Sequence, residues 1–142
     1  MDSAAVSGSA VSDVPFSAGD GLRAAIIDWQ RWLRSERRVS EHTFDAYARD
    51  LAAFLIFMTE HLGAAPDIAD FAAFRPADFR SYLAHRSNIG ISRASIARGV
   101  STLRNLFRFL ERADLVQARV MKERDAVVER QTFAGVELRA DR

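Results

Sequence analysis

The chain has 142 residues, 49% of them hydrophobic, a length and composition that suit one compact domain with a buried core. Its 20 basic and 19 acidic side chains leave a net charge of +1. The absence of cysteine excludes a disulfide framework, a thiolate metal site and a thiol nucleophile, and it fits a reducing compartment. Because no apolar run in the sequence approaches the roughly 20 residues of a membrane span, we expect a soluble, cytoplasmic protein without a membrane partner.

The N-terminal segment, residues 1–20, is rich in Ala, Ser and Gly and lacks the basic and apolar segments of a signal peptide, so we expect a flexible tail. A first helix follows, with Asp20 as its N-cap and the polar stretch 34–38 at its end. Its apolar residues recur at spacings of four, three and four, as on one helical stripe. They are Leu22, Ile26, Trp29 and Leu33.

A second helix is predicted after Ser40, whose hydroxyl suits the N-cap, and Gly63 is well placed to end it. Successive helical residues are about 100° apart, and on that spacing one face is apolar. The apolar face comprises Phe44, Tyr47, Leu51, Phe54, Leu55, Met58 and Leu62. The opposite face comprises His42, Asp45, Ala46 and Arg49.

The segment 64–75 is expected to be a short turn or an extended connection that folds Ile68, Phe71 and Phe74 under the helices. Pro76 suits the first position of a third helix, which we expect to run to about Ser87. An Asn-Ile-Gly turn at 88–90 would end that helix.

A fourth helix is predicted after Ser92, again in the N-cap position. Its apolar face comprises Ile96, Val100, Leu103, Phe107 and Leu110. On an adjacent face Arg104, Arg108 and Arg112 recur every four residues, with Arg93 and Arg98 at the edge. Between Arg86 and Arg112 there are six arginines and one glutamate, the strongest concentration of charge in the sequence.

No segment shows the alternation of a half-buried strand, so the predicted fold is all-α: a bundle of four helices over residues 21–115. Residues 116–142 are weakly patterned and are expected to form a linker or an extra C-terminal helix.

The sequence offers no support for catalysis or for a cofactor. The three histidines are too far apart for a helical pair of metal ligands, and no glycine-rich loop or nucleophile elbow is present, so we expect no metal and no small-molecule substrate. Tyr47 and Tyr82 both fall on apolar helix faces, where a tyrosine ring is packed in the core and its hydroxyl reaches the rim.

The arginine row on the fourth helix has two interpretations. Most charged helix faces are simply solvated. A solvated face, however, usually alternates signs to gain favourable pairs four residues apart, whereas these arginines repel one another. Such repulsion is tolerated best opposite a polyanion, which makes nucleic acid a candidate partner.

Three stretches resemble one known family. Residues 38–55, RVSEHTFDAYARDLAAFL, are similar to the second-helix motif of tyrosine recombinases of the XerC/XerD and phage-integrase type. Residues 90–110, GISRASIARGVSTLRNLFRFL, resemble the fourth-helix motif of that family, and residues 78–84 its third helix. The resemblance covers about residues 22–115.

This resemblance implies a SAM-like core-binding domain, a four-helix orthogonal bundle that forms half of a clamp around double-stranded DNA with its second and fourth helices facing the major groove. Residues 120–130 are similar to an extra helix that related recombinases use between neighbouring subunits, so the resemblance also makes residues 116–142 a candidate for self-association. The positions that match the two motifs and are expected to bind DNA are Ser40, Thr43, Arg49, Ser92, Arg93, Ser95, Arg98 and Arg104. Hydroxyls of Thr43 and Ser95 would donate to phosphate, and Arg49 and Arg104 would neutralise it. Arg93 and Arg98 would reach base edges.

Asp45 departs from this pattern, because a carboxylate beside the DNA backbone is repelled unless it accepts from a cytosine amino group or pairs with Arg49.

The catalytic domain of the family, with its nucleophilic tyrosine and its Arg/His constellation, has no counterpart in these 142 residues. We therefore expect no enzymatic activity from this chain alone and interpret it as part of a recombinase, either a fragment or a truncated gene product. The parent would join sister subunits in a tetrameric synapse, for chromosome dimer resolution or for integration of a mobile element. The alternative is a helical interaction module that associates with an intact recombinase and does not bind DNA.

Overall fold

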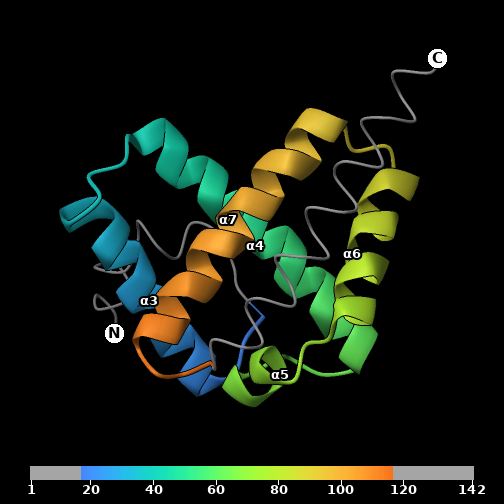
Figure 1. Ribbon diagram of the computed structural model, residues 1–142, viewed down its shortest axis with the longest axis horizontal. Helices are drawn as coiled ribbons and strands as arrows, with labels where there is room; N and C mark the ends of the chain where they lie inside the picture. Colours follow the sequence, from blue (N-terminus) through green and yellow to red (C-terminus); the bar gives the residue numbers. More distant parts are fainter. Residues whose placement is uncertain (1–16, 117–142) are drawn as a thin grey trace, which may run out of the picture. The chain divides into compact units, whose positions relative to one another are not determined.

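The computed structural model describes residues 17–116. Within them the chain forms five helices and no strand, which confirms the all-α prediction (Figure 1). The helices are α3 (Asp20–Ser35), α4 (Glu41–Leu62), α5 (Ile68–Ala72), α6 (Pro76–Asn88) and α7 (Arg93–Arg112). Residues 1–16 of the tail predicted over 1–20 lie outside the described part, as do residues 117–142, where a linker or an extra helix is expected. Of the four tail residues that are described, Asp20 begins α3 and Gly19 donates its N–H to the Pro66 carbonyl at 2.8 Å. None of the five helices combines the length and the apolar content that crossing a lipid bilayer demands.

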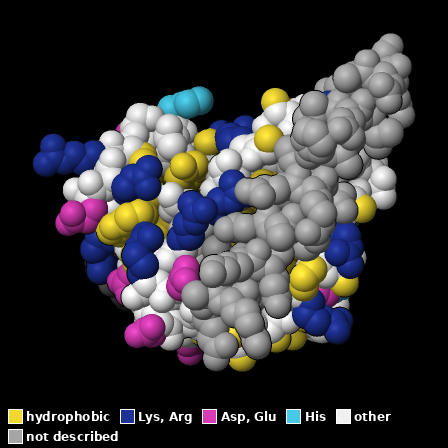
Figure 2. Space-filling model, in the orientation of Figure 1, with side chains coloured by type: hydrophobic (Ala, Val, Ile, Leu, Met, Phe, Trp, Pro, Cys, Tyr) yellow, Lys and Arg dark blue, Asp and Glu magenta, His cyan; other side chains and the backbone are white. Residues whose placement is uncertain are grey.

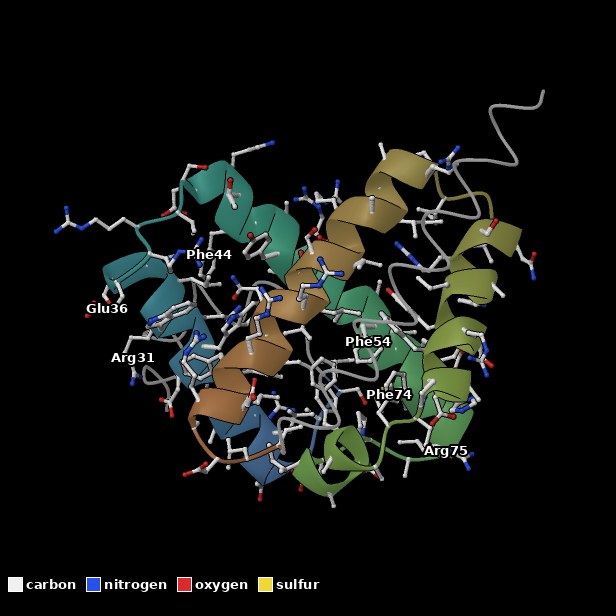
Figure 3. The ribbon with its side chains drawn as sticks, in the orientation of Figure 1. Arg31, Glu36, Phe44, Phe54, Phe74 and Arg75 are labelled. Carbon is white, nitrogen blue, oxygen red and sulfur yellow. The ribbon has the colours of Figure 1, made fainter. Side chains whose placement is uncertain are left out.

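The chain divides into two compact units, one ending at Ile68 and the other beginning at Ala69. In the first unit α3 packs on α4. The apolar stripe predicted for α3 is fully buried, and most of the stripe predicted for α4 is buried with it. The Trp29 and Tyr47 rings stack with their centroids 6.1 Å apart, so Tyr47 serves packing, as predicted. Phe44 and Phe54 lie inside, while Arg31 and Glu36 point outward (Figure 3).

Two predictions for α4 were wrong at single residues. Ala46 was placed on the polar face but is only 6% exposed, because the buried side of α4 extends to Asp50 and Phe57, which lie within about 40° of Ala46 around the helix. Leu62 was placed on the apolar face but is 45% exposed, because it is the last residue of the helix and no further turn follows to cover it.

The start of α3 is capped by a residue from elsewhere in the sequence. The helix begins at Asp20 with Gly19 as its N-cap, so Asp20 is not the cap that the sequence predicted. Instead Asp67 Oδ1 accepts hydrogen bonds from the backbone N–H of Leu22 at 2.8 Å and of Ile68 at 2.9 Å. A β-carbon at position 19 would lie 2.6 Å from the Asp67 carboxyl carbon, so any larger residue there would displace the capping carboxylate.

Replacing Asp67 with alanine is expected to lower the free energy of unfolding by about 1–2 kcal/mol, because two backbone N–H groups lose their acceptor. Asp67→Asn keeps an oxygen at this position and should cost clearly less. Urea denaturation followed by circular dichroism measures both. Equal losses in the two variants would mean that the hydrogen bonds of Asp67 Oδ1 do not stabilise the start of α3.

The other ends of the long helices follow local sequence signals. Ser40 caps α4 through a hydrogen bond from the Thr43 N–H at 3.1 Å, and Gly63 ends α4 with φ of 82°, both as predicted. Ser92 caps α7 in the same way. Pro76 is the first residue of α6, and its helix runs one residue beyond the predicted end, to Asn88.

In the second unit α6 packs on α7, and the connection before α6 contains the short helix α5 rather than only a turn or an extended segment. This single turn places Phe71 against Phe107 of α7, with ring centroids 5.1 Å apart and Phe71 completely buried. Phe74 meets Phe79 edge to face at 6.2 Å. Five residues are too few to show a helical period in sequence, so only the packing of Phe71 reveals the turn.

Candidate nucleic-acid interface

The N-terminus of α4 carries a pair of coupled hydroxyls. Ser40 Oγ accepts the Thr43 N–H and donates its own hydrogen to Thr43 Oγ1 at 3.0 Å. The Ser40 hydroxyl is therefore used within the helix cap, whereas the hydroxyl hydrogen of Thr43 has no acceptor among residues 17–116. Ser40 is exposed and Thr43 is half-buried, so Thr43 can donate to a group outside the protein.

The N-terminus of α7 repeats this arrangement. Ser92 Oγ accepts the Ser95 N–H at 3.1 Å and donates to Ser95 Oγ at 3.1 Å. Within the described part of the chain the Ser95 hydroxyl hydrogen has no acceptor either. Each of these two helices therefore begins with one hydroxyl that caps the backbone and a second that remains available as a donor at the positive end of the helix dipole.

Arg49 extends the polar face of α4 away from this cap. At about 100° per residue it shares that face with His42 and Asp45, and all three are exposed. Asp45 and Arg49 do not form an ion pair, and neither has a side-chain partner among residues 17–116. An ion pair with Arg49 therefore does not neutralise Asp45. The guanidinium of Arg49, with no acceptor in residues 17–116, can donate hydrogen bonds to an external group.

The basic face of α7 lies opposite its buried face. At about 100° per residue the five arginines of α7 fall within an arc of about 140°. They are Arg93, Arg98, Arg104, Arg108 and Arg112. The buried residues Val100, Thr102, Leu103, Leu106, Phe107 and Leu110 occupy the rest of the helix. Figure 2 shows basic side chains on the surface where α7 runs.

Within this basic face the arginines differ in their surroundings. Arg93 has no partner among the described residues, whereas Arg98, Arg104, Arg108 and Arg112 each take part in contacts within the chain. Arg98 and Arg108 are exposed, and Arg93 and Arg104 are half-buried. The aliphatic stem of a half-buried arginine can pack on the protein while its guanidinium meets a ligand.

The eight predicted residues are divided between the two units. Ser40, Thr43 and Arg49 belong to the first, and the other five belong to the second. In each unit one helix carries both a donor hydroxyl and a guanidinium that has no partner among residues 17–116, which are Thr43 and Arg49 on α4 and Ser95 and Arg93 on α7. It shows no group of three His, Asp or Glu residues in 17–116 that could hold a metal ion.

Comparison with known proteins identifies this kind of domain. Residues 26–114 match the family described as phage integrase, N-terminal SAM-like domain, and the chain belongs to that family.

The chain is also similar to several bacterial recombinases. It is 47% identical over 97 residues to the tyrosine recombinase XerC of Mesorhizobium japonicum, covering 68% of this chain and 31% of that protein. It is 47% identical over 101 residues to XerC of Rhizobium meliloti, covering 69% and 32%. XerC of Rhodospirillum centenum is 39% identical over 106 residues, covering 75% and 31%. The chain thus spans about a third of the length of the curated relatives it matches, and no solved structure matches it.

Proposed function

We propose that this chain is the DNA-binding N-terminal domain of a site-specific tyrosine recombinase and that it holds the recombination core site during strand exchange. The observation that carries the proposal is the repeated hydroxyl pair, Ser40–Thr43 on α4 and Ser92–Ser95 on α7. Capping alone needs one hydroxyl at each helix start. The second hydroxyl, whose hydrogen has no acceptor among residues 17–116, suits a phosphate oxygen.

The roles of the remaining residues follow from their charge and reach. Arg49 and Arg104 neutralise backbone phosphates, which sets the affinity and the position of the domain on the duplex. Arg93 and Arg98 reach base edges in the major groove, where a guanidinium bonds guanine through two parallel hydrogen bonds. Asp45 accepts from a cytosine amino group, because its carboxylate has no basic partner within residues 17–116.

The biological setting of this binding is chromosome dimer resolution or integration of a mobile element, in a tetrameric synapse with sister subunits. The relatives named tyrosine recombinase XerC support a recombination setting. Strand cleavage itself belongs to the parent recombinase rather than to the segment from 26 to 114 that matches the SAM-like family.

The proposal predicts salt-dependent binding to duplex DNA. Fluorescence anisotropy with a labelled duplex of about 30 base pairs should show the logarithm of the affinity falling with the logarithm of the salt concentration, with a slope of about −2 or steeper, because Arg49 and Arg104 release at least two counterions. A salt-independent affinity would contradict phosphate contacts. No binding at low salt would favour the alternative of a helical interaction module, for which the exposed side chains of Ile56 and Ile89 are candidate apolar contacts.

A further inference from the structure

The turn between α3 and α4 contains a residue in an unusual backbone conformation. Among residues 17–116 four positions have a positive φ, and two of these are Gly63 at 82° and Gly90 at 90°. The other two are Arg38 at 52° and Asp114 at 61°. A side chain in this left-handed region crowds the following carbonyl group, which is why glycine is the usual residue there.

The backbone of the turn requires the left-handed conformation but does not require arginine. With Arg38 left-handed, the next N–H, that of Val39, reaches the Leu33 carbonyl at 3.1 Å and closes the end of α3. Asp114 serves α7 in the same way, because the Leu115 N–H then bonds the Leu110 carbonyl at 2.8 Å. A glycine would allow both closures without steric strain.

The arginines that precede Arg38 already have partners within the protein. These contacts are Arg31 with Asp28 at 3.3 Å, Arg34 with Glu41 at 3.4 Å and with the Phe44 ring at 4.0 Å, and Arg37 with the Trp32 ring at 5.6 Å. Arg38 is exposed, and within residues 17–116 it has no hydrogen bond, ion pair or ring contact. No contact of the Arg38 side chain with residues 17–116 stabilises the turn, whereas the strained backbone conformation of Arg38 lowers the free energy of unfolding.

We propose that Arg38 is a further DNA contact and that it binds a backbone phosphate next to the α4 hydroxyl pair. The proposal rests on the proposed function. Arg38 is two residues before Ser40, so their α-carbons are at most about 7 Å apart, and an arginine side chain spans that distance easily. A phosphate is favoured over a base because the neighbouring donor, the Thr43 hydroxyl, suits the DNA backbone.

The test compares Arg38→Gly with the wild-type chain on a labelled mixed-sequence duplex of about 30 base pairs. The variant should bind roughly threefold to tenfold more weakly at low salt, and its salt slope should be shallower by about one unit, the loss of one phosphate contact. Its melting temperature should be unchanged or higher, because glycine relieves the left-handed strain. Arg38→Lys keeps the charge and should keep most of the salt slope.

Two controls separate a local contact from general effects. Asp114→Gly relieves the same backbone conformation and should not weaken binding. Arg31→Gln removes the same charge from a residue paired with Asp28 and should weaken binding less than Arg38→Gly. If Arg38→Gly kept the wild-type affinity and salt slope, the role of Arg38 would be overturned but the proposed function would not. A wild-type chain that fails to bind the duplex at low salt would overturn the proposed function and this inference together.

Discussion

Replacing Arg98 with alanine is expected to weaken binding to a recombination core site by about 1–3 kcal/mol, or roughly 5- to 150-fold, with a much smaller effect on mixed-sequence DNA. Arg98 is exposed on the basic face of α7, five residues after the Arg93 that begins that helix. A guanidinium that makes two hydrogen bonds to guanine distinguishes this base from the other three, so its loss reduces specificity more than general affinity.

Arg104→Ala is the matched comparison, because it removes the same side chain from the same helix. A phosphate contact is independent of sequence, so Arg104→Ala should weaken binding to both duplexes alike and reduce the salt slope by about one unit. The core site for this assay can be selected from a randomised duplex library. Circular dichroism melting of both variants checks that the fold is intact, since both arginines also make contacts within the chain. Equal losses of specificity in the two variants would refute the division of roles.

Phe71→Ala should lower the free energy of unfolding by about 3–5 kcal/mol. The ring is completely buried and lies 5.1 Å from the Phe107 ring of α7, so its removal leaves a cavity against the helix that carries the basic face. For a domain of this size, such a loss is a large part of the total stability.

Urea denaturation measures this effect. Phe71→Leu fills much of the same space and should cost clearly less than alanine. Ile56→Ala removes a side chain that is 56% exposed and should change the free energy of unfolding by no more than about 0.5 kcal/mol. A Phe71→Ala variant as stable as Ile56→Ala would show that α5 does not anchor the second unit.

The long helices were predictable because their signals are local. Ser40 and Ser92 bond an N–H three residues away, Gly63 adopts the positive φ that only glycine takes at no steric cost, and Pro76 needs no N–H partner at a helix start. Each of these effects acts within one helical turn, so the order of residues is enough to reveal it.

The candidate interface was predictable only in part. Motif resemblance identified Thr43 and Ser95. That their hydroxyl hydrogens have no acceptor in residues 17–116 becomes visible only when the partners of Ser40 and Ser92 are known. Nothing in the sequence distinguishes Arg38 from the neighbouring arginines, because its left-handed backbone and its lack of a partner in residues 17–116 depend on how the turn closes α3.

The sequence by itself determined the all-α class, the extent of the four long helices and the basic face of α7, because helical periodicity, end caps and charge spacing are properties of neighbouring residues. Only the tertiary structure decided that Asp67 caps α3 and that a five-residue helix buries Phe71. The physical reason is distance along the chain. Asp67 is 45 residues from the Leu22 N–H that it accepts, and a contact of that kind exists only after the chain has packed.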